Sequence, residues 1–339
     1  MKTILKSFYT YASALINPPT DVYVQTPVGL VLGTRSDPRF GDVDSFLGIK
    51  YAHVGQRFTK SRLMNHRDDY GQVEYIDATD FGAYCWQEDQ DMPYYENQRQ
   101  EEECLFLNIW RPAGAPSNAK LPVMVYIHGG QWGIQGSADP PVWGHNLARE
   151  QHVIVISINY RLGIFGFLAT DVHGSNGMNA FDDQVKALEW INRNVNSFGG
   201  DANLVTVFGQ NVGSASVCYL VRFDIVYLSI HYTHMRILLI LSLFYSCTAQ
   251  SVNPSASGLF RRGIMQSGEC LVGANRPDSI KLISGPEGYD ITLDILDDLD
   301  ATSVAELADR TLYPASEIAG ARQMGDPILD KTVLPDYPS

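Results

Sequence analysis

The chain has 339 residues, of which 45% are hydrophobic and 19% charged, a composition typical of a globular protein and unlike that of a disordered one. Its formal net charge of −13 repels polyanions, so nucleic acid is excluded as an expected partner.

The first twenty residues are compatible with two interpretations. Lys2 and Lys6 precede a short apolar stretch, and Ala12-Ser13-Ala14 has the small residues of a cleavage site, so residues 1–20 are either a weak signal peptide or an unstructured N-terminus. The apolar stretch is short, and no N-x-S/T sequon free of an intervening proline occurs in the chain. Both points weaken the secretory interpretation without removing it.

The next segments predict strands and one long loop. Tyr23–Leu32 alternates around Thr26-Pro27 and predicts an antiparallel hairpin. Asp68–Glu103 is polar and aromatic without a sustained period, as expected of a long loop. Leu105–Trp110 and Val123–Ile127 are apolar runs, which predicts strands buried on both faces.

A glycine-rich turn, His128-Gly129-Gly130-Gln131, follows the second of these strands. Backbone N–H groups in such a loop can point at a developing oxyanion, and the expected donors are those of Gly130, Gln131 and Val212. Gln131 has less backbone freedom than a glycine would have there. Taken alone, the motif is equally compatible with a plain tight turn.

Another strand and a helix come next. Val153–Asn159 predicts a strand, and Ala180–Val195 has apolar residues at helical spacing. Gly199-Gly200 provides the expected helix end. The order of strands and helices predicts a mostly parallel twisted sheet with helices on both faces.

Residues 204–220 then show a strand, a turn flanked by Gly209 and Gly213, and a helix, which is the layout of a nucleophile elbow. Asn211 stands at the apex, after Gln210, and its carboxamide has no ionisable hydroxyl for a base to activate. The apex requires a positive φ, which asparagine tolerates better than most residues. Ser214 and Ser216 lie beyond the apex on the helix, so we do not expect either to replace the nucleophile.

Several stretches resemble signatures of the type-B carboxylesterase/cholinesterase family, in family order. They are FLGIKYAHVGQRF (46–58), EECLFLNIW (102–110), VMVYIHGG (123–130), SINYRLGIFGFLA (157–169, like the family's next strand), DDQVKALEWINRNVNSFGGD (182–201), the elbow and GLFRRGIMQSG (258–268). The resemblance implies an α/β-hydrolase fold and serine-esterase ancestry. It also places a serine at position 211 and a glutamate at position 210, so this chain departs from the pattern at both.

The resemblance further implies a disulfide between Cys85 and Cys104, which needs an oxidising compartment; two reduced cysteines are the alternative. Trp86 follows the first cysteine, but no tryptophan occupies the later part of the loop, where cholinesterases hold a quaternary ammonium. Choline specificity is therefore not expected, and Trp86 is interpreted as a packed loop aromatic.

Residues 221–250 interrupt the family pattern. The segment begins Val-Arg, which GTA-AGA can encode, and ends in Gln, which CAG can encode, so our hypothesis is a translated intron. The alternative, a membrane helix, is weakened because His231, His234 and Arg236 break the apolar stretch before it reaches the ~20 residues that a span needs. His231 and His234 have no further ligands at a recognisable spacing, so no metal site is expected.

The C-terminal third predicts an exposed helix at Ser303–Thr311, after an acidic run that we interpret as a solvated surface. Gly325–Ser339 resembles the family segment PVVDGxFLPDxP, and the family's acidic triad residue and histidine come after that segment. Residues 21–339 are therefore expected to be the N-terminal portion of the family domain, C-terminally truncated.

These features predict a family member that does not hydrolyse esters. One alternative is a non-catalytic adhesion or recognition module of the neuroligin type, which binds a small apolar ester or a protein partner. Another is an active carboxylic-ester hydrolase obscured by a faulty gene prediction. We expect no cofactor, no metal and no membrane insertion, and a secreted or extracellular location; the oligomeric state is left open.

Overall fold

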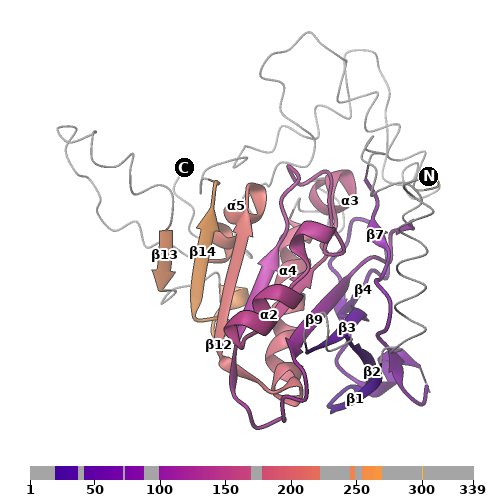
Figure 1. Ribbon diagram of the computed structural model, residues 1–339. Helices are drawn as coiled ribbons and strands as arrows, with labels where there is room; N and C mark the ends of the chain where they lie inside the picture. The colour runs from indigo at the N-terminus through magenta and orange to yellow at the C-terminus, as the bar shows by residue number, and fades with distance from the viewer. Residues whose placement is uncertain are drawn as a thin grey trace, which may run out of the picture.

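The computed structural model describes residues 20–36, 42–71, 73–87, 99–168, 178–221, 245–248, 254–268 and 300 (Figure 1). The predictions for residues 1–19, for most of 221–250, for Ser303–Thr311 and for 325–339 lie outside these residues, as does the acidic run apart from Asp300.

In the described part of the chain, ten strands form one mixed sheet. Its order is β1 (Thr20–Thr26), β2 (Gly29–Arg35), β3 (Val43–Lys50), β9 (Phe106–Pro112), β11 (Ile154–Ile158), β10 (Leu121–Ile127), β12 (Gly200–Gln210), β14 (Arg262–Gln266) and β13 (Tyr245–Thr248), with β6 (Ile76–Asp77) beside β2. Two small sheets pair β4 (Ala52–His53) with β5 (Arg62–Leu63), and β7 (Tyr84–Cys85) with β8 (Gln100–Glu101).

Four α-helices and four short 3-10 helices accompany the sheet in the described residues. They are α2 (His145–Gln151), α3 (Gly163–Phe167), α4 (Asn179–Asn194) and α5 (Val212–Leu220), with η2 (Arg67–Tyr70), η3 (Pro140–Val142), η4 (Val195–Phe198) and η5 (Pro254–Ala256). The predicted long helix is confirmed as α4, and its extension η4 ends at Gly199, whose φ of 87° places it in the left-handed region.

The predicted N-terminal hairpin is confirmed and lies at one edge of the sheet. β1 and β2 pair antiparallel with Thr26 opposite Gly29, so the turn contains only Pro27 and Val28. The Thr26 hydroxyl donates to the Gly29 carbonyl oxygen at 2.7 Å and closes this turn.

The parallel part of the sheet brings three strand ends together. β10 pairs parallel with both β11 and β12, and Ile127 lies opposite Ile158 on one side and Gly209 on the other. The glycine-rich turn after β10 and the turn after β12 therefore emerge at the same edge. The pairing becomes antiparallel from β11 through β9 and β3 to β1.

Helices cover both faces of the sheet, as predicted (Figure 1). On one face, alternate residues of the central strands, such as Ile156 and Val207, pack into a large apolar core with α4 and α5. On the other face, Val155 and Trp110 pack with Ala148 of α2 in a smaller cluster. The strand alternation thus divides each central strand between two helical layers.

Three features differ from the sequence prediction. Residues 157–169 are not one strand: β11 ends at Ile158, and α3 begins at Gly163, whose φ of 49° interrupts extended backbone. The expected loop at 68–103 contains the short strands β6, β7 and β8, which are too brief to show a period. Within the interrupting segment 221–250, Tyr245–Thr248 forms β13 and pairs antiparallel with β14.

Candidate functional site

The turn between β12 and α5 places Asn211 at its apex. Asn211 has φ 58° and ψ −127°, is exposed, and donates its backbone N–H to the Gln266 carbonyl oxygen at 3.0 Å. The predicted positive φ is confirmed. The ψ lies outside the left-handed helical region where asparagine is favoured, so tolerance of that region explains only part of this conformation.

Close packing explains the two glycines that flank the apex. A Cβ on Gly209 would overlap the Gly213 carbonyl oxygen, and a Cβ on Gly213 would overlap the Ile127 carbonyl oxygen. The start of α5 therefore lies directly against the end of β10, which requires residues without side chains.

The loop after β10 lies beside this apex. A Cβ on Gly129 would be 3.1 Å from the Asn211 Cβ and 2.9 Å from the Gln210 carbonyl oxygen. Gly130, Gln131 and Trp132 follow with φ of 86°, 54° and 58°. Gln131 thus adopts a positive φ in spite of its side chain, where a glycine would be the favoured residue.

Three backbone N–H groups at this edge have no acceptor in the part of the chain that the structure describes. Among the described residues, the N–H groups of Gly130, Gln131 and Val212 donate no hydrogen bond. Val212 is the first residue of α5, where a helix leaves its N–H groups unpaired. The predicted donors thus come from two neighbouring turns, a geometry suited to a carbonyl or carboxylate oxygen.

The two serines on α5 are buried and hydrogen-bonded. The Ser216 hydroxyl accepts hydrogen bonds from the Trp132 indole at 3.3 Å and from the Gln184 amide at 3.2 Å. The Ser214 hydroxyl donates to the Gly268 carbonyl oxygen at 3.3 Å. Both side chains contribute to packing, which supports the expectation that neither replaces a nucleophile.

His128 is a structural residue that sequence reasoning placed only within the glycine motif. Its ring is buried, stacks on Tyr160 with 4.3 Å between centroids, and places Nδ1 3.0 Å from the Gly129 carbonyl oxygen. The Tyr160 hydroxyl donates to the His128 carbonyl oxygen at 2.8 Å. Burial lowers the pKa of His128 to about 4, so the ring is neutral at physiological pH.

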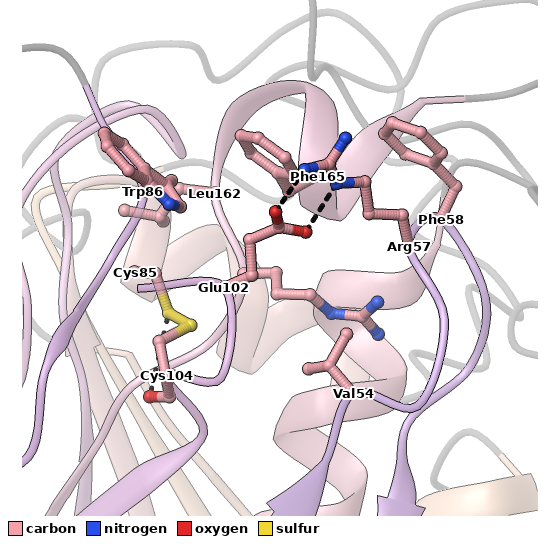
Figure 2. Close-up of a pocket in the computed structure, with 10 residues that line it drawn as sticks. Val54, Arg57, Phe58, Cys85, Trp86, Glu102, Cys104, Leu162 and Phe165 are labelled. Carbon is pink, nitrogen blue, oxygen red and sulfur yellow. Dashed lines mark hydrogen bonds and ion pairs between the residues drawn. A yellow bond between two sulfur atoms is a disulfide. The ribbon is translucent and has the colours of Figure 1, made fainter. Parts of the chain in front are cut away.

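The implied disulfide is confirmed: the sulfur atoms of Cys85 and Cys104 are bonded at 2.01 Å. Beside it lies a small hollow, rimmed by the half-buried Trp86 (Figure 2). At its centre the Arg57 guanidinium donates to both carboxylate oxygens of Glu102 at 2.7 and 2.5 Å. Because Arg57 and Glu102 satisfy each other, this hollow offers a ligand little unpaired charge.

The described residues contain neither a metal-binding cluster nor a helix that could cross a membrane. No group of three or more His, Cys, Asp or Glu side chains in these ranges is arranged to hold a metal ion. Within the same ranges, every helix is too short or too polar to cross a bilayer. His231 and His234 lie outside the described residues.

Comparison with curated proteins gives several relatives. The chain is 39% identical to mouse cholinesterase over 212 residues, which are 58% of this chain and 34% of that protein. It is 34% identical to para-nitrobenzyl esterase of Bacillus subtilis (strain 168) over 260 residues, 74% of this chain and 44% of that protein. It is 32% identical to dog (Canis lupus familiaris) carboxylesterase 5A over 282 residues, 80% and 43% of the two chains. The chain thus spans less than half the length of these relatives.

Solved structures of PNB esterases show the same architecture. One, titled PNB esterase, has a TM-score of 0.70 and 28% sequence identity, with 94% of this chain and 59% of that chain covered. A second, titled as a thermophilic PNB esterase, has a TM-score of 0.72 and 28% sequence identity. It also matches 94% of this chain and 59% of that chain. The fold is therefore the α/β-hydrolase fold that the sequence predicted.

A family profile described as "Carboxylesterase family" matches residues 20–231, more than half of the chain and all of the elbow. The chain belongs to the carboxylesterase family.

Proposed function

We propose that this protein is a carboxylesterase-family member that does not hydrolyse esters. The observation that carries the proposal is Asn211 at the exposed apex between β12 and α5. A carboxamide supplies no alkoxide to attack an acyl carbon, and loss of the nucleophile costs a serine hydrolase about 10⁶ in kcat. Gln210, beside the apex, is uncharged and supplies no acid or base.

The site is suited to binding without chemistry. The N–H groups of Gly130, Gln131 and Val212, which have no acceptor among the described residues, offer an oxyanion or a polarised carbonyl three donors. We infer that a small apolar ester, or the carboxylate it would yield, binds here and leaves unchanged. A protein partner on the outer surface is the second kind of ligand in this proposal.

We also propose that the protein is secreted or extracellular. The Cys85–Cys104 disulfide supports this location, because such bonds form and persist in oxidising compartments.

The test of the proposal is a fluorophosphonate label combined with a p-nitrophenyl butyrate assay. The chain is expected to show no covalent adduct and only background hydrolysis, while para-nitrobenzyl esterase of Bacillus subtilis (strain 168), assayed in parallel, provides the positive control. An adduct on any side chain, together with turnover, would contradict the proposal. A saturation-transfer NMR experiment with ethyl butyrate then tests binding, and absence of transfer would limit the proposal to protein partners.

A second candidate, carboxylic-ester hydrolysis, is favoured by the names of the relatives and by the tightly packed glycines that shape the elbow. It requires that the functional product encode serine at position 211. Full-length transcripts decide between the two: serine at 211, with the interrupting codons 221–250 removed, favours the hydrolase. Asn211 retained beside a stalk or a membrane anchor favours an adhesion module of the neuroligin type.

A further inference from the structure

The loop that carries the proposed N–H donors has an unfavourable backbone. We define the oxyanion loop as residues 130–137. Four of its residues have positive φ: Gly130 (86°), Gln131 (54°), Trp132 (58°) and Gln135 (79°). Three of the four have side chains, for which this region is costly. Such a conformation persists only where surrounding contacts determine it, so the contacts that hold the loop matter to its function.

One end of the loop is held by α5 and by the first residue of α3. The Trp132 indole donates to the Ser216 hydroxyl at 3.3 Å, and the Trp132 carbonyl oxygen accepts from the Gly163 N–H at 2.7 Å. These contacts lie near the proposed donors. The distal end, at Gln135 and Ser137, depends on other residues.

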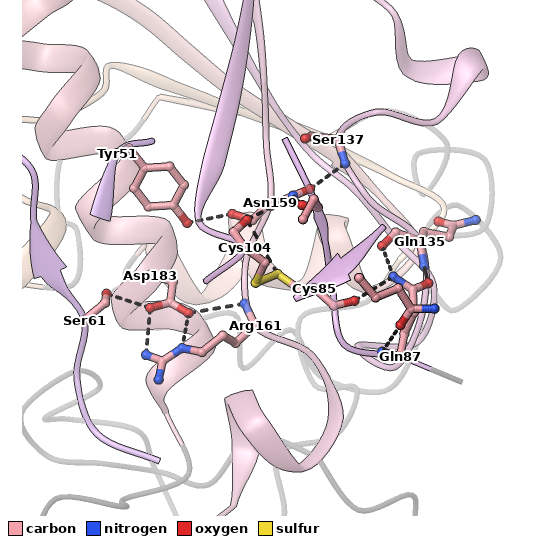
Figure 3. The surroundings of a disulfide bond; sticks show 12 residues. Tyr51, Ser61, Cys85, Gln87, Cys104, Gln135, Ser137, Asn159, Arg161 and Asp183 are labelled. Atoms are coloured by element: carbon pink, nitrogen blue, oxygen red, sulfur yellow. Dashed lines mark hydrogen bonds and ion pairs between the residues drawn. A yellow bond between two sulfur atoms is a disulfide. The ribbon is translucent and has the colours of Figure 1, made fainter. Parts of the chain in front are cut away.

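Gln87 holds Gln135 through a reciprocal pair of hydrogen bonds (Figure 3). The Gln87 side-chain oxygen accepts from the Gln135 backbone N–H at 2.7 Å, and its amide nitrogen donates to the Gln135 carbonyl oxygen at 3.0 Å. The same nitrogen donates to the Cys85 carbonyl oxygen at 3.1 Å. One buried carboxamide therefore connects the loop to the first half-cystine.

Asn159 holds Ser137 through a single hydrogen bond. Its side-chain oxygen accepts from the Ser137 N–H at 2.8 Å, and its amide nitrogen donates to the Cys104 carbonyl oxygen at 3.0 Å. Figure 3 shows Gln87 and Asn159 on either side of the bonded cysteines. The carbonyl oxygen of each half-cystine thus accepts a hydrogen bond from one carboxamide, and that carboxamide also bonds to the distal end of the loop.

We propose that Gln87 and Asn159 are positioning residues for the oxyanion loop and that the Cys85–Cys104 disulfide is their common anchor. The disulfide limits the distance between the Cys85 and Cys104 carbonyl groups, which accept hydrogen bonds from Gln87 and Asn159. Through these two side chains the disulfide restricts the positions of residues 135–137. Reduction of the disulfide releases the constraint, so presentation of the loop's N–H groups depends on the redox state of this bond. The inference rests on the proposed role of the loop in binding an ester carbonyl.

Hydrogen-deuterium exchange of the loop tests the inference without a ligand, so its failure is distinct from failure of the proposed function. The reporters are the Gly133 and Ile134 N–H groups, which both donate to the Gly130 carbonyl oxygen at 3.0 Å and do not touch Gln87. Gln87→Ala is expected to lower their protection at least tenfold. β11 serves as an internal reference for global stability, and Gln56→Ala, at an exposed glutamine, is the matched control.

Reduction provides the second arm. Treating the wild type with a phosphine reductant is expected to lower protection at Gly133 and Ile134 as Gln87→Ala does, and combining the two is expected to add little. Unchanged protection at these amides in either arm would overturn the proposal. Additive effects would overturn the claim of a common anchor, and an equal loss in β11 would show global unfolding in place of positioning.

A conservative variant keeps the test informative if Gln87→Ala folds poorly. Gln87→Glu retains the acceptor for Gln135 but, when ionised, has no donor for the two carbonyl oxygens. Protonation restores one donor, so the loop's protection factor is expected to recover in part as pH falls from 7.5 to 5. A protection factor that shows no such recovery would contradict the assigned hydrogen bonds.

Discussion

The backbone of Asn211 concentrates strain at a single residue of the turn. Its φ of 58° and ψ of −127° form a combination that only glycine adopts readily. In a serine hydrolase the same turn exposes the nucleophile. In this chain the residue in that conformation is an asparagine.

Asn211→Gly is therefore expected to stabilise the fold by about 1 kcal/mol. Relief of roughly 1–3 kcal/mol of strain outweighs the added flexibility of glycine in the unfolded chain, which costs about 0.4–1 kcal/mol. Urea unfolding measures the difference. Asn146→Gly, at an exposed position inside α2, is the control and should destabilise by roughly 0.3 kcal/mol. A destabilised Asn211→Gly would mean that the asparagine side chain itself supports the turn.

His128 predicts a dependence of stability on pH. Its pKa is lowered to about 4 in the folded state from 6.5, so below pH 6.5 the unfolded chain binds a proton that the folded chain refuses. Stability is therefore greatest above pH 6.5, and this group removes about 3 kcal/mol as pH falls from 6.5 to 4.

The measurement compares urea unfolding of the wild type and of His128→Phe at pH 7.5 and pH 5. Phenylalanine retains a ring to stack on Tyr160 but does not titrate, so the variant should lose less stability on acidification. Equal losses in the two proteins would show that His128 does not contribute to the acid sensitivity.

At the scale of elements, a buried ion pair joins the end of β11 to α4. The Arg161 guanidinium donates to both Asp183 oxygens at 2.7 and 2.8 Å, and the Ser61 hydroxyl donates to the same carboxylate at 2.7 Å. The side chains of Arg161 and Asp183 are only 3% and 0% exposed. Burial lowers the pKa of Arg161, but the neighbouring Asp183 carboxylate outweighs it and raises that pKa, so the guanidinium stays charged.

Asp183→Asn is expected to destabilise the protein by about 3–5 kcal/mol, because it leaves a buried guanidinium without its counter-charge. Thermal unfolding followed by circular dichroism measures the loss. The exposed pair of Arg62 and Asp69 is the matched comparison, and Arg62→Ala should cost no more than about 1 kcal/mol. Similar losses in the two variants would argue against a special role for the buried pair.

At the scale of the whole molecule, the long helix and the hairpin were predictable because their apolar residues repeat at the period of a helix or of a strand. The apolar stripe from Phe181 to Val195 predicts α4, and the alternation around Thr26 predicts the N-terminal hairpin. The disulfide was predicted from the resemblance to a family, because the period of the hydrophobic residues gives no information about which cysteines pair. The elbow was visible because its glycines stand at a fixed spacing around residue 211.

Other features depend on contacts between distant segments. The hydrogen bonds of Gln87 join residues 48 positions apart, and those of Asn159 reach back 55 positions to Cys104. Polar residues in a loop without a period give no signal of such pairs. The burial of His128 was equally hidden, because it depends on Tyr160 from the neighbouring strand end. The short strands β7 and β8 pair beside the disulfide, and with two residues each they are too brief to give a periodic signal.

The flanking glycines have one more consequence. Because Gly209 and Gly213 let the start of α5 pack against the end of β10, backbone contacts on both sides of position 211 hold the main chain of the turn. A hydroxyl, a thiol or a selenol introduced at that point would be raised above the sheet in the same pose. The turn is thus a ready-made scaffold for placing an engineered nucleophile beside the backbone N–H groups of the neighbouring loop.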